Sequence, residues 1–156
     1  MAGTAIIRIG DREWQVSVAA TPAELASGLG GIESLLPWTG MLFDLGYERP
    51  LQVTTEPMLF PLDIVFIGED LKVIDVVQDV EPGNILNHDT PARYFLEMNA
   101  GEADGIEPGD SVAVWYDETP SLGWLEGVLP ILGLVMSCAL MAPLAQQLAG
   151  NGDHHR

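Results

Sequence analysis

Apolar residues occur in short blocks along most of the chain, a pattern that favours strands over helices. The longest block spans Met58–Val77, where Leu62–Ile67 and Lys72–Val77 predict two strands joined by a short polar loop. Both faces of this predicted hairpin are largely apolar. An edge strand more often alternates apolar with polar residues, so we expect the hairpin to be covered on both sides.

The segments around this hairpin predict further short strands and little helix. Strands are predicted over Thr4–Ile9, Arg12–Val18, Gly40–Leu45, Leu51–Thr55, Ala92–Asn99 and Ser111–Tyr116. Thr21, Pro22 and Glu24 form a helix start with a capping box, and the polar stretch Asp79–Pro91 predicts a long loop. The predicted class is α+β: a mostly antiparallel, curled, barrel-like sheet with one or two short helices, plus a C-terminal hydrophobic helix.

The hydropathy of the chain changes after residue 117. We expect a globular domain over residues 1–117, a linker over 118–126 and a disordered tail over 146–156. Between the last two lies Gly127–Ala145, which contains no charged residue. Its length approaches the ~20 residues that cross a hydrocarbon core, so a transmembrane helix is predicted. The alternative is a hydrophobic helix packed on protein.

The charge balance limits the partners of the chain. It has 23 acidic and 6 basic residues, a formal net charge of −17. No basic patch is available to neutralise phosphates, so we expect no nucleic acid partner. The single cysteine excludes an intrachain disulfide and a cysteine-rich zinc site. The apolar segment Gly127–Ala145 places the expected location at a membrane. Because the N-terminus lacks the pattern of a signal peptide, the domain is expected to face the cytoplasm by default.

Three motifs occur in an order and spacing that resemble the bacterial and archaeal domain-of-unknown-function 192 family. They are Gly40–Phe43, Pro61–Ile67 and Ala92–Gly101, the last followed by Gly105–Ile106 and Pro108–Asp110. The resemblance covers about residues 21–115 and implies a small α+β domain with a barrel-like sheet and no established activity. The chain departs from the family pattern twice. Thr54–Met58 stands where members usually have Trp-Met-Lys-Asn-Thr, and Gly28–Gly30 where they tend to have Gly-Leu-Met.

Asp63 is the most informative polar residue because it lies in an apolar strand, where a carboxylate needs hydrogen bonds or a cation. We favour a carboxylate that accepts backbone N–H groups; the functional alternative is a ligand anchor or an acid/base group. Thr54, Thr55 and Glu56 occupy the place of the family's polar cluster, and their functional interpretation is the rim of a small-ligand site.

His88 and Arg93 complete the candidate ligand-binding residues. His88 stands beside Asp89 in the predicted loop, but no second ligand follows at helical or strand spacing. Arg93 and Glu97 share a strand face and are predicted to form an ion pair; alternatively, Arg93 holds Asp63 or an anionic ligand. No residue is assigned as catalytic or metal-binding, and no cofactor is expected.

These features predict a non-enzymatic accessory module that binds a ligand or partner and is tethered by Gly127–Ala145 to membrane lipid or partner helices. A protein partner would contact the loop Asp79–Pro91 and the sheet face near Asp63. One alternative is a structural subunit of an envelope or virion assembly, in which the apolar tail packs against neighbouring subunits. A second is a hydrolase that uses Asp63 and His88, with Glu97 as a third member of the constellation. Paired carboxylates are disfavoured, because pairing of Ile67 with Lys72 would point Asp63 and Asp75 to opposite faces.

A fractionation experiment tests the predicted anchor. The full chain should sediment with membranes and need detergent for release, because Gly127–Ala145 is long and apolar enough to span the hydrocarbon core. The matched control lacks residues 127–145 and should remain in the soluble fraction. A full chain that elutes as a monomer without detergent would contradict the anchor, whereas defined large oligomers that need the segment would favour the assembly alternative.

Overall fold

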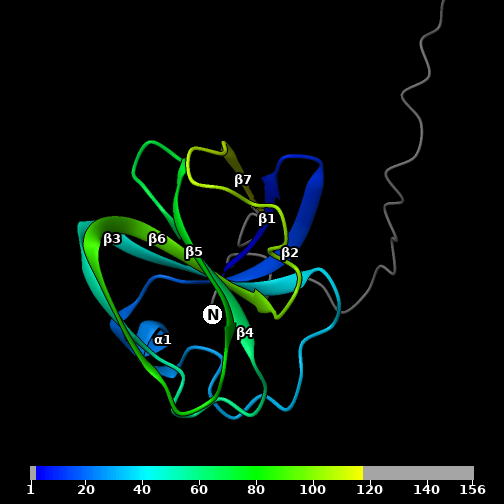
Figure 1. The fold of residues 1–156 in the computed structure, drawn as a ribbon, viewed down its shortest axis with the longest axis vertical. Coiled ribbons are helices and arrows are strands. Elements are labelled where there is room, and N and C mark those ends of the chain that lie inside the picture. Colours follow the sequence, from blue (N-terminus) through cyan, green and yellow to red (C-terminus); the bar gives the residue numbers. More distant parts are fainter. Residues whose placement is uncertain (1–2, 118–156) are drawn as a thin grey trace, which may run out of the picture. The chain divides into compact units, whose positions relative to one another are not determined.

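The computed structural model describes residues 3–117, which form one sheet and one short helix (Figure 1). The elements are β1 (Gly3–Ile9), β2 (Arg12–Ala19), α1 (Pro22–Ser27), β3 (Thr39–Thr54), β4 (Leu62–Ile67), β5 (Val73–Val80), β6 (Ile85–Asn99) and β7 (Val112–Tyr116). The seven strands lie in the order β5-β4-β6-β3-β2-β1-β7. Every neighbouring pair is antiparallel except β2 and β3, whose parallel pairing needs the crossover that contains α1.

The predicted mostly antiparallel sheet with a short helix is confirmed, but the sheet does not close into a barrel. Its edge strands β5 and β7 meet at one end, where an isolated bridge joins Lys72 to Ser111. No helix within residues 3–117 is long and apolar enough to cross a membrane. The linker 118–126, the candidate transmembrane helix 127–145 and the tail 146–156 lie outside the described residues.

Helix α1 begins with the predicted capping box. The hydroxyl of Thr21 accepts a hydrogen bond from the Glu24 N–H at 3.3 Å, and the Glu24 carboxylate accepts one from the Thr21 N–H at 3.1 Å. These bonds lower the pKa of Glu24. The helix ends at Gly28, whose φ of 47° is unfavourable for residues with a side chain. Six residues make a marginal helix, so its position depends on these caps.

The sheet carries an apolar core on each face, and all six residues of β4 are buried between the two. The first core contains Trp14, Val65 and Leu96. The second contains Phe43 and Phe95, whose rings stack with centroids 4.2 Å apart, and Leu25 of α1 packs against it. The two cores explain why the apolar positions of the central hairpin do not alternate with polar ones.

The central hairpin forms with a register that differs from the prediction. Ile67 pairs with Val73 instead of Lys72, and a register shift follows Phe66. Bulges of this kind cannot be located from an alternating pattern, because both faces of the hairpin are largely apolar. Asp63 and Asp75 nevertheless lie on opposite faces, as expected: Asp63 pairs with Met98 of the first core, and Asp75 with Phe66 of the second.

Strand β3 is continuous where the sequence predicted two strands and an intervening turn. Register shifts relative to β6 occur between Asp44 and Arg49 and between Arg49 and Leu51. The Asp44 carboxylate accepts the N–H of Gly46 at 2.8 Å, and Gly46 has a φ of 80°. These local features are typical of a turn, but the strand resumes its pairing with β6 beyond them.

The prediction of a long loop over Asp79–Pro91 is wrong. Strand β6 begins at Ile85, so His88 and Asp89 belong to a strand. The connection from β5 is a short turn that is held by the buried Thr55, whose hydroxyl donates to the Glu81 carbonyl at 2.7 Å. The polar character of this region has a simple cause: much of the first half of β6 is exposed. A partner surface built on a long loop is therefore absent from the described fold.

Gly40 allows β3 to approach β6, which makes a substitution informative. A Cβ at Gly40 would overlap the backbone carbonyl oxygen of Glu97. We expect Gly40→Ala to lower the free energy of unfolding by about 1–3 kcal/mol, measured by urea denaturation. Gly3→Ala is the matched control, because open space surrounds that position. Equal stability of the two variants would contradict the close approach.

Candidate functional site

A cavity of about 110 Å³ lies between α1, the segment that follows it, and the paired strands β3 and β6. Most of its wall is apolar and includes Leu25, Leu29, Phe43, Met58 and Phe95. Such a volume holds several water molecules or one end of a small organic molecule. Concave, mainly apolar sites with a few polar groups are the usual form of ligand pockets.

Glu97 is the only titratable residue among those that line the cavity. It belongs to β6 between Met41 of β3 and Ile64 of β4, and its exposed fraction is 4%. Within residues 3–117 no hydrogen bond or ion pair reaches its carboxyl group. Burial raises the pKa of Glu97 from 4.5 to about 8, so the group is mostly protonated at neutral pH.

The other polar groups of the wall make their hydrogen bonds within the protein. The Ser27 hydroxyl donates to the Ala23 carbonyl at 3.0 Å, and the Gln52 amide donates to the Asn87 side chain at 2.9 Å. Gly28 and Gly30 donate their N–H groups to carbonyls of the helix end. The carboxyl group of Glu97 thus remains the polar side chain available to a ligand.

A groove of about 270 Å³ continues from the cavity. The two hollows share the lining residues Leu25, Phe43, Gln52 and Phe95, so the stacked Phe43 and Phe95 rings border both. Arg49 lines the groove but not the cavity. A ligand with one end beside Glu97 can therefore extend along the groove.

Asp63 has the structural role that we favoured. It is fully buried, and its carboxylate accepts N–H groups from Asp79 at 3.0 Å and from Gly101 and Ala103 at 2.9 Å each. The donors come from β5 and from the turn after β6. Both oxygens are occupied, so Asp63 is a poor ligand anchor.

Only one residue of the polar cluster Thr54–Glu56 borders the cavity. Thr54 lines it, and its hydroxyl accepts the N–H of Glu56 at 3.2 Å. Thr55 is fully buried and serves the β5–β6 turn, where its hydroxyl also accepts the Asn84 N–H at 3.0 Å. Glu56 is exposed and does not line the cavity.

His88 makes its contacts with Phe66 and Asp75, and none of them involves Asp63. Its ring stacks on Phe66 with centroids 3.9 Å apart, and its Nε2 lies 3.5 Å from an oxygen of Asp75. Asp63 and His88 share no partner in these contacts, and Asp63 lies on the sheet face opposite to Phe66. The structure therefore does not join them as a hydrolase would require. Within residues 3–117, no group of three potential metal-ligating side chains is found.

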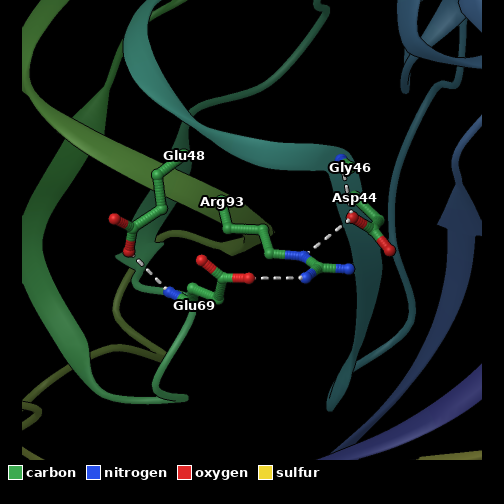
Figure 2. A network of polar contacts seen from close by, with 5 residues as sticks. All are labelled: Asp44, Gly46, Glu48, Glu69 and Arg93. Atoms are coloured by element: carbon green, nitrogen blue, oxygen red, sulfur yellow. Dashed lines mark hydrogen bonds and ion pairs between the residues drawn. The ribbon is translucent and has the colours of Figure 1, made fainter.

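Arg93 bridges the bulge of β3 and the turn after β4 (Figure 2). Its Nε lies 3.5 Å from Asp44 and its Nη1 lies 3.3 Å from Glu69, whose own N–H donates to Glu48 at 2.8 Å. The predicted ion pair with Glu97 is wrong. Residues four apart in a strand share a face but lie about 13 Å apart along it, beyond the reach of a direct contact. The sequence alone could have shown this, because the spacing rules out a direct contact between Arg93 and Glu97. Without that ion pair, Glu97 is an acid in an apolar strand and therefore a candidate site residue.

Comparison with known proteins identifies the family. The model of the domain-of-unknown-function 192 family, DUF192, described as an uncharacterized ACR, matches residues 5–114. The chain belongs to the DUF192 family. A protein of Sinorhizobium meliloti 1021, described as a proposed transcription regulator, has a similar structure with a TM-score of 0.69 at 29% identity, covering 72% of this chain and 95% of that one. A protein of unknown function from Novosphingobium aromaticivorans DSM 12444 gives a TM-score of 0.65 at 29% identity, covering 72% and 84%. No curated protein matches the chain.

Both departures from the family pattern border the cavity. Gly30 stands where DUF192 members tend to have methionine, and Thr54 and Pro57 fall within the stretch that members usually fill with Trp-Met-Lys-Asn-Thr. These three residues line the cavity together with Glu97, for which no ion pair is found within residues 3–117.

The pH dependence of stability tests the state of Glu97. Because its pKa rises from 4.5 to about 8 on folding, the folded protein retains a proton that the unfolded chain releases. This group therefore lowers the free energy of unfolding as pH rises through that window, and it contributes no slope outside it. Glu97→Gln removes the contribution. Urea denaturation should show the variant gaining stability over the wild type by a few kcal/mol from about pH 5 to about pH 8. A difference that stays constant with pH would contradict burial of an unpaired carboxyl group.

Proposed function

We propose that this DUF192 domain is a ligand-binding module whose site is the cavity beside α1, with the adjoining groove accommodating the rest of the ligand. The observation that carries the proposal is the buried Glu97 carboxyl group, which faces a cavity and lacks a partner among residues 3–117. No group of residues 3–117 bonds to this carboxyl group, so a ligand in the cavity meets no competing protein donor there. Strongly perturbed titratable groups in hollows are typical of functional sites.

Binding is better supported than catalysis. Asp63, the acid expected in an enzyme, is occupied by three backbone N–H groups. The hydroxyls at the cavity, from Ser27 and Thr54, make local hydrogen bonds and have no basic partner among the described contacts. A nucleophile needs an adjacent base or a lowered pKa to act. The proposal therefore assigns recognition to the cavity, and no reaction.

The wider biological setting is also a proposal. We propose that Gly127–Ala145 tethers the module to a membrane or to partner helices, supported by its length and lack of charge. Packing of that segment against neighbouring subunits is the alternative. The description of the Sinorhizobium meliloti protein as a transcription regulator is not carried over as DNA binding, because acidic residues greatly outnumber basic ones here.

A blocking variant tests the proposed site. Ala26 lies on the exposed rim of the cavity, whereas Ala23 is exposed on the same helix and does not line it. We expect 1-butanol, a small neutral probe, to shift the backbone amide NMR signals of Phe43, Met58 and Glu97. Ala26→Trp should weaken that binding about tenfold or more by filling the opening, and Ala23→Trp should leave it unchanged. Shifts confined to other regions, or equal binding by both variants, would refute the site.

A further inference from the structure

The polar groups around the cavity are complementary to a hydrogen-bond donor. The side-chain donors, Ser27 and Gln52, are used within the protein, while the carboxyl oxygens of Glu97 accept no hydrogen bond from residues 3–117. Leu25 and Ala26, in the last turn of α1, also line the cavity. The carbonyls of Ala23, Glu24 and Ser27 accept hydrogen bonds from the Ser27 hydroxyl and from the N–H groups of Gly28 and Gly30. Glu97 is therefore the side chain of the wall that can offer a ligand a full carboxylate acceptor once it has lost its proton.

Glu97 has no counter-ion within the described part of the chain. Residues 3–117 contain 20 acidic and 5 basic side chains. Arg8 pairs with Glu13, and Arg93 with Asp44 and Glu69. The remaining basic residues do not line the cavity. The described part of the chain therefore leaves the carboxyl group open to a cationic ligand, and the excess negative charge of the protein favours the approach of cations.

The other arginines have partners elsewhere. Arg12 donates to the Glu102 carbonyl at 2.9 Å. Arg49 lies over the Tyr47 ring, 5.3 Å from its centroid, and lines only the adjoining groove. Arg49 is the only basic residue that lines the groove, and its positive charge makes the groove suit an uncharged chain better than a second cationic group.

We infer that the cavity binds a primary ammonium group carried on a short, unbranched apolar stem, with the Glu97 carboxylate as its counter-ion. This inference rests on the proposed function and names the chemical class of its ligand. The ammonium group donates hydrogen bonds to the Glu97 carboxylate, and the stem contacts Phe43 and Phe95. A lysine side chain and a free alkylamine share this chemistry.

Binding of the ammonium ligand releases a proton from Glu97. The ligand arrives as R–NH3⁺ and stays protonated, while Glu97 changes from the carboxylic acid to the carboxylate and releases one proton to solvent. Affinity should therefore rise about tenfold per pH unit below about pH 8 and level off above it. An uncharged ligand that accepts a hydrogen bond from the acid would show the opposite trend.

Charged groups on the surrounding elements do not obscure that trend. On α1, the Glu24 carboxylate caps the helix start. On β4, Asp63 lies on the opposite face and is held by backbone N–H groups. Glu56, which follows β3, is exposed, and Arg49 of β3 borders only the groove. Glu97 is the sole titratable residue of the cavity wall.

Calorimetric titration of the full chain, in detergent if it requires one, tests the inference. The probes are n-butylammonium and its neutral counterpart 1-butanol, with Nα-acetyl-lysine N-methylamide and the norleucine analogue as the amino-acid pair. At pH 7 we expect each ammonium probe to bind about 10- to 100-fold more tightly than its neutral counterpart. Titrations in buffers of different ionisation enthalpy should show release of nearly one proton, declining to none above about pH 9.

Two variants separate the cavity from general attraction to an acidic protein. Glu97→Gln should abolish the preference for ammonium and the proton release while it retains binding of 1-butanol, which shows that the cavity is intact. Glu33→Gln, at an exposed position in the loop after α1, should behave as the wild type. If the lysine derivative binds more tightly than butylammonium, the natural ligand is a lysine side chain of a protein. If butylammonium binds more tightly, the natural ligand is a free amine. Either result supports the inference.

The inference and the proposed function fail in different ways. If 1-butanol binds in the cavity as tightly as butylammonium, or if the ammonium preference survives Glu97→Gln, the ammonium inference is overturned and the proposed binding site stands. If none of the four probes shifts the NMR signals of residues around the cavity, both are overturned.

Discussion

Burial of β4 on both faces is the constraint on which the rest of this fold depends. Every residue of the strand is buried, so each polar group on or beside it must be satisfied within the protein or by a ligand. Two acids are subject to this constraint at adjacent positions of the β4–β6 ladder. Asp63 pairs with Met98, and Ile64 pairs with Glu97. Asp63 accepts three backbone N–H groups, whereas Glu97 on the other face has none within the described fold. Asp63 thus links β4 to β5 and to the turn after β6, and Glu97 is the residue on which the proposed site depends.

Several local features place Glu97 in its cavity. Gly40 permits the close approach of β3 to the Glu97 backbone. The capping box fixes the start of a helix too short to be stable alone, and this helix forms one wall. The Phe43–Phe95 stack forms another. None of these features forms a hydrogen bond with the carboxyl group of Glu97. The described fold therefore places an unpaired carboxyl group among apolar side chains. The ligand proposals follow from that arrangement.

The sequence predicted the local elements of the fold better than their long-range pairing. The capping box at Thr21, the opening hairpin and the double-sided burial of β4 follow from patterns within a few residues, and all three are present. The hairpin register, the continuity of β3 and the start of β6 depend on bulges and on which strand lies alongside, and the local pattern does not encode these. The same limit applies to the site. Asp63 stood out because it is an acid among apolar residues, but Glu97 was obscured by an ion pair with Arg93 that strand geometry does not allow.

The proposed site depends on the state of Glu97, a buried carboxyl group for which no partner is found within residues 3–117. Carbon-13 NMR titration of the glutamate side-chain carboxyl signals measures that state, with the Glu97 signal assigned by its loss in Glu97→Gln. We expect a midpoint near the pKa of about 8 that burial imposes on Glu97. A midpoint near 4.5, the ordinary value for a glutamate, would mean that the group is hydrated or paired and would rule out the proposed site.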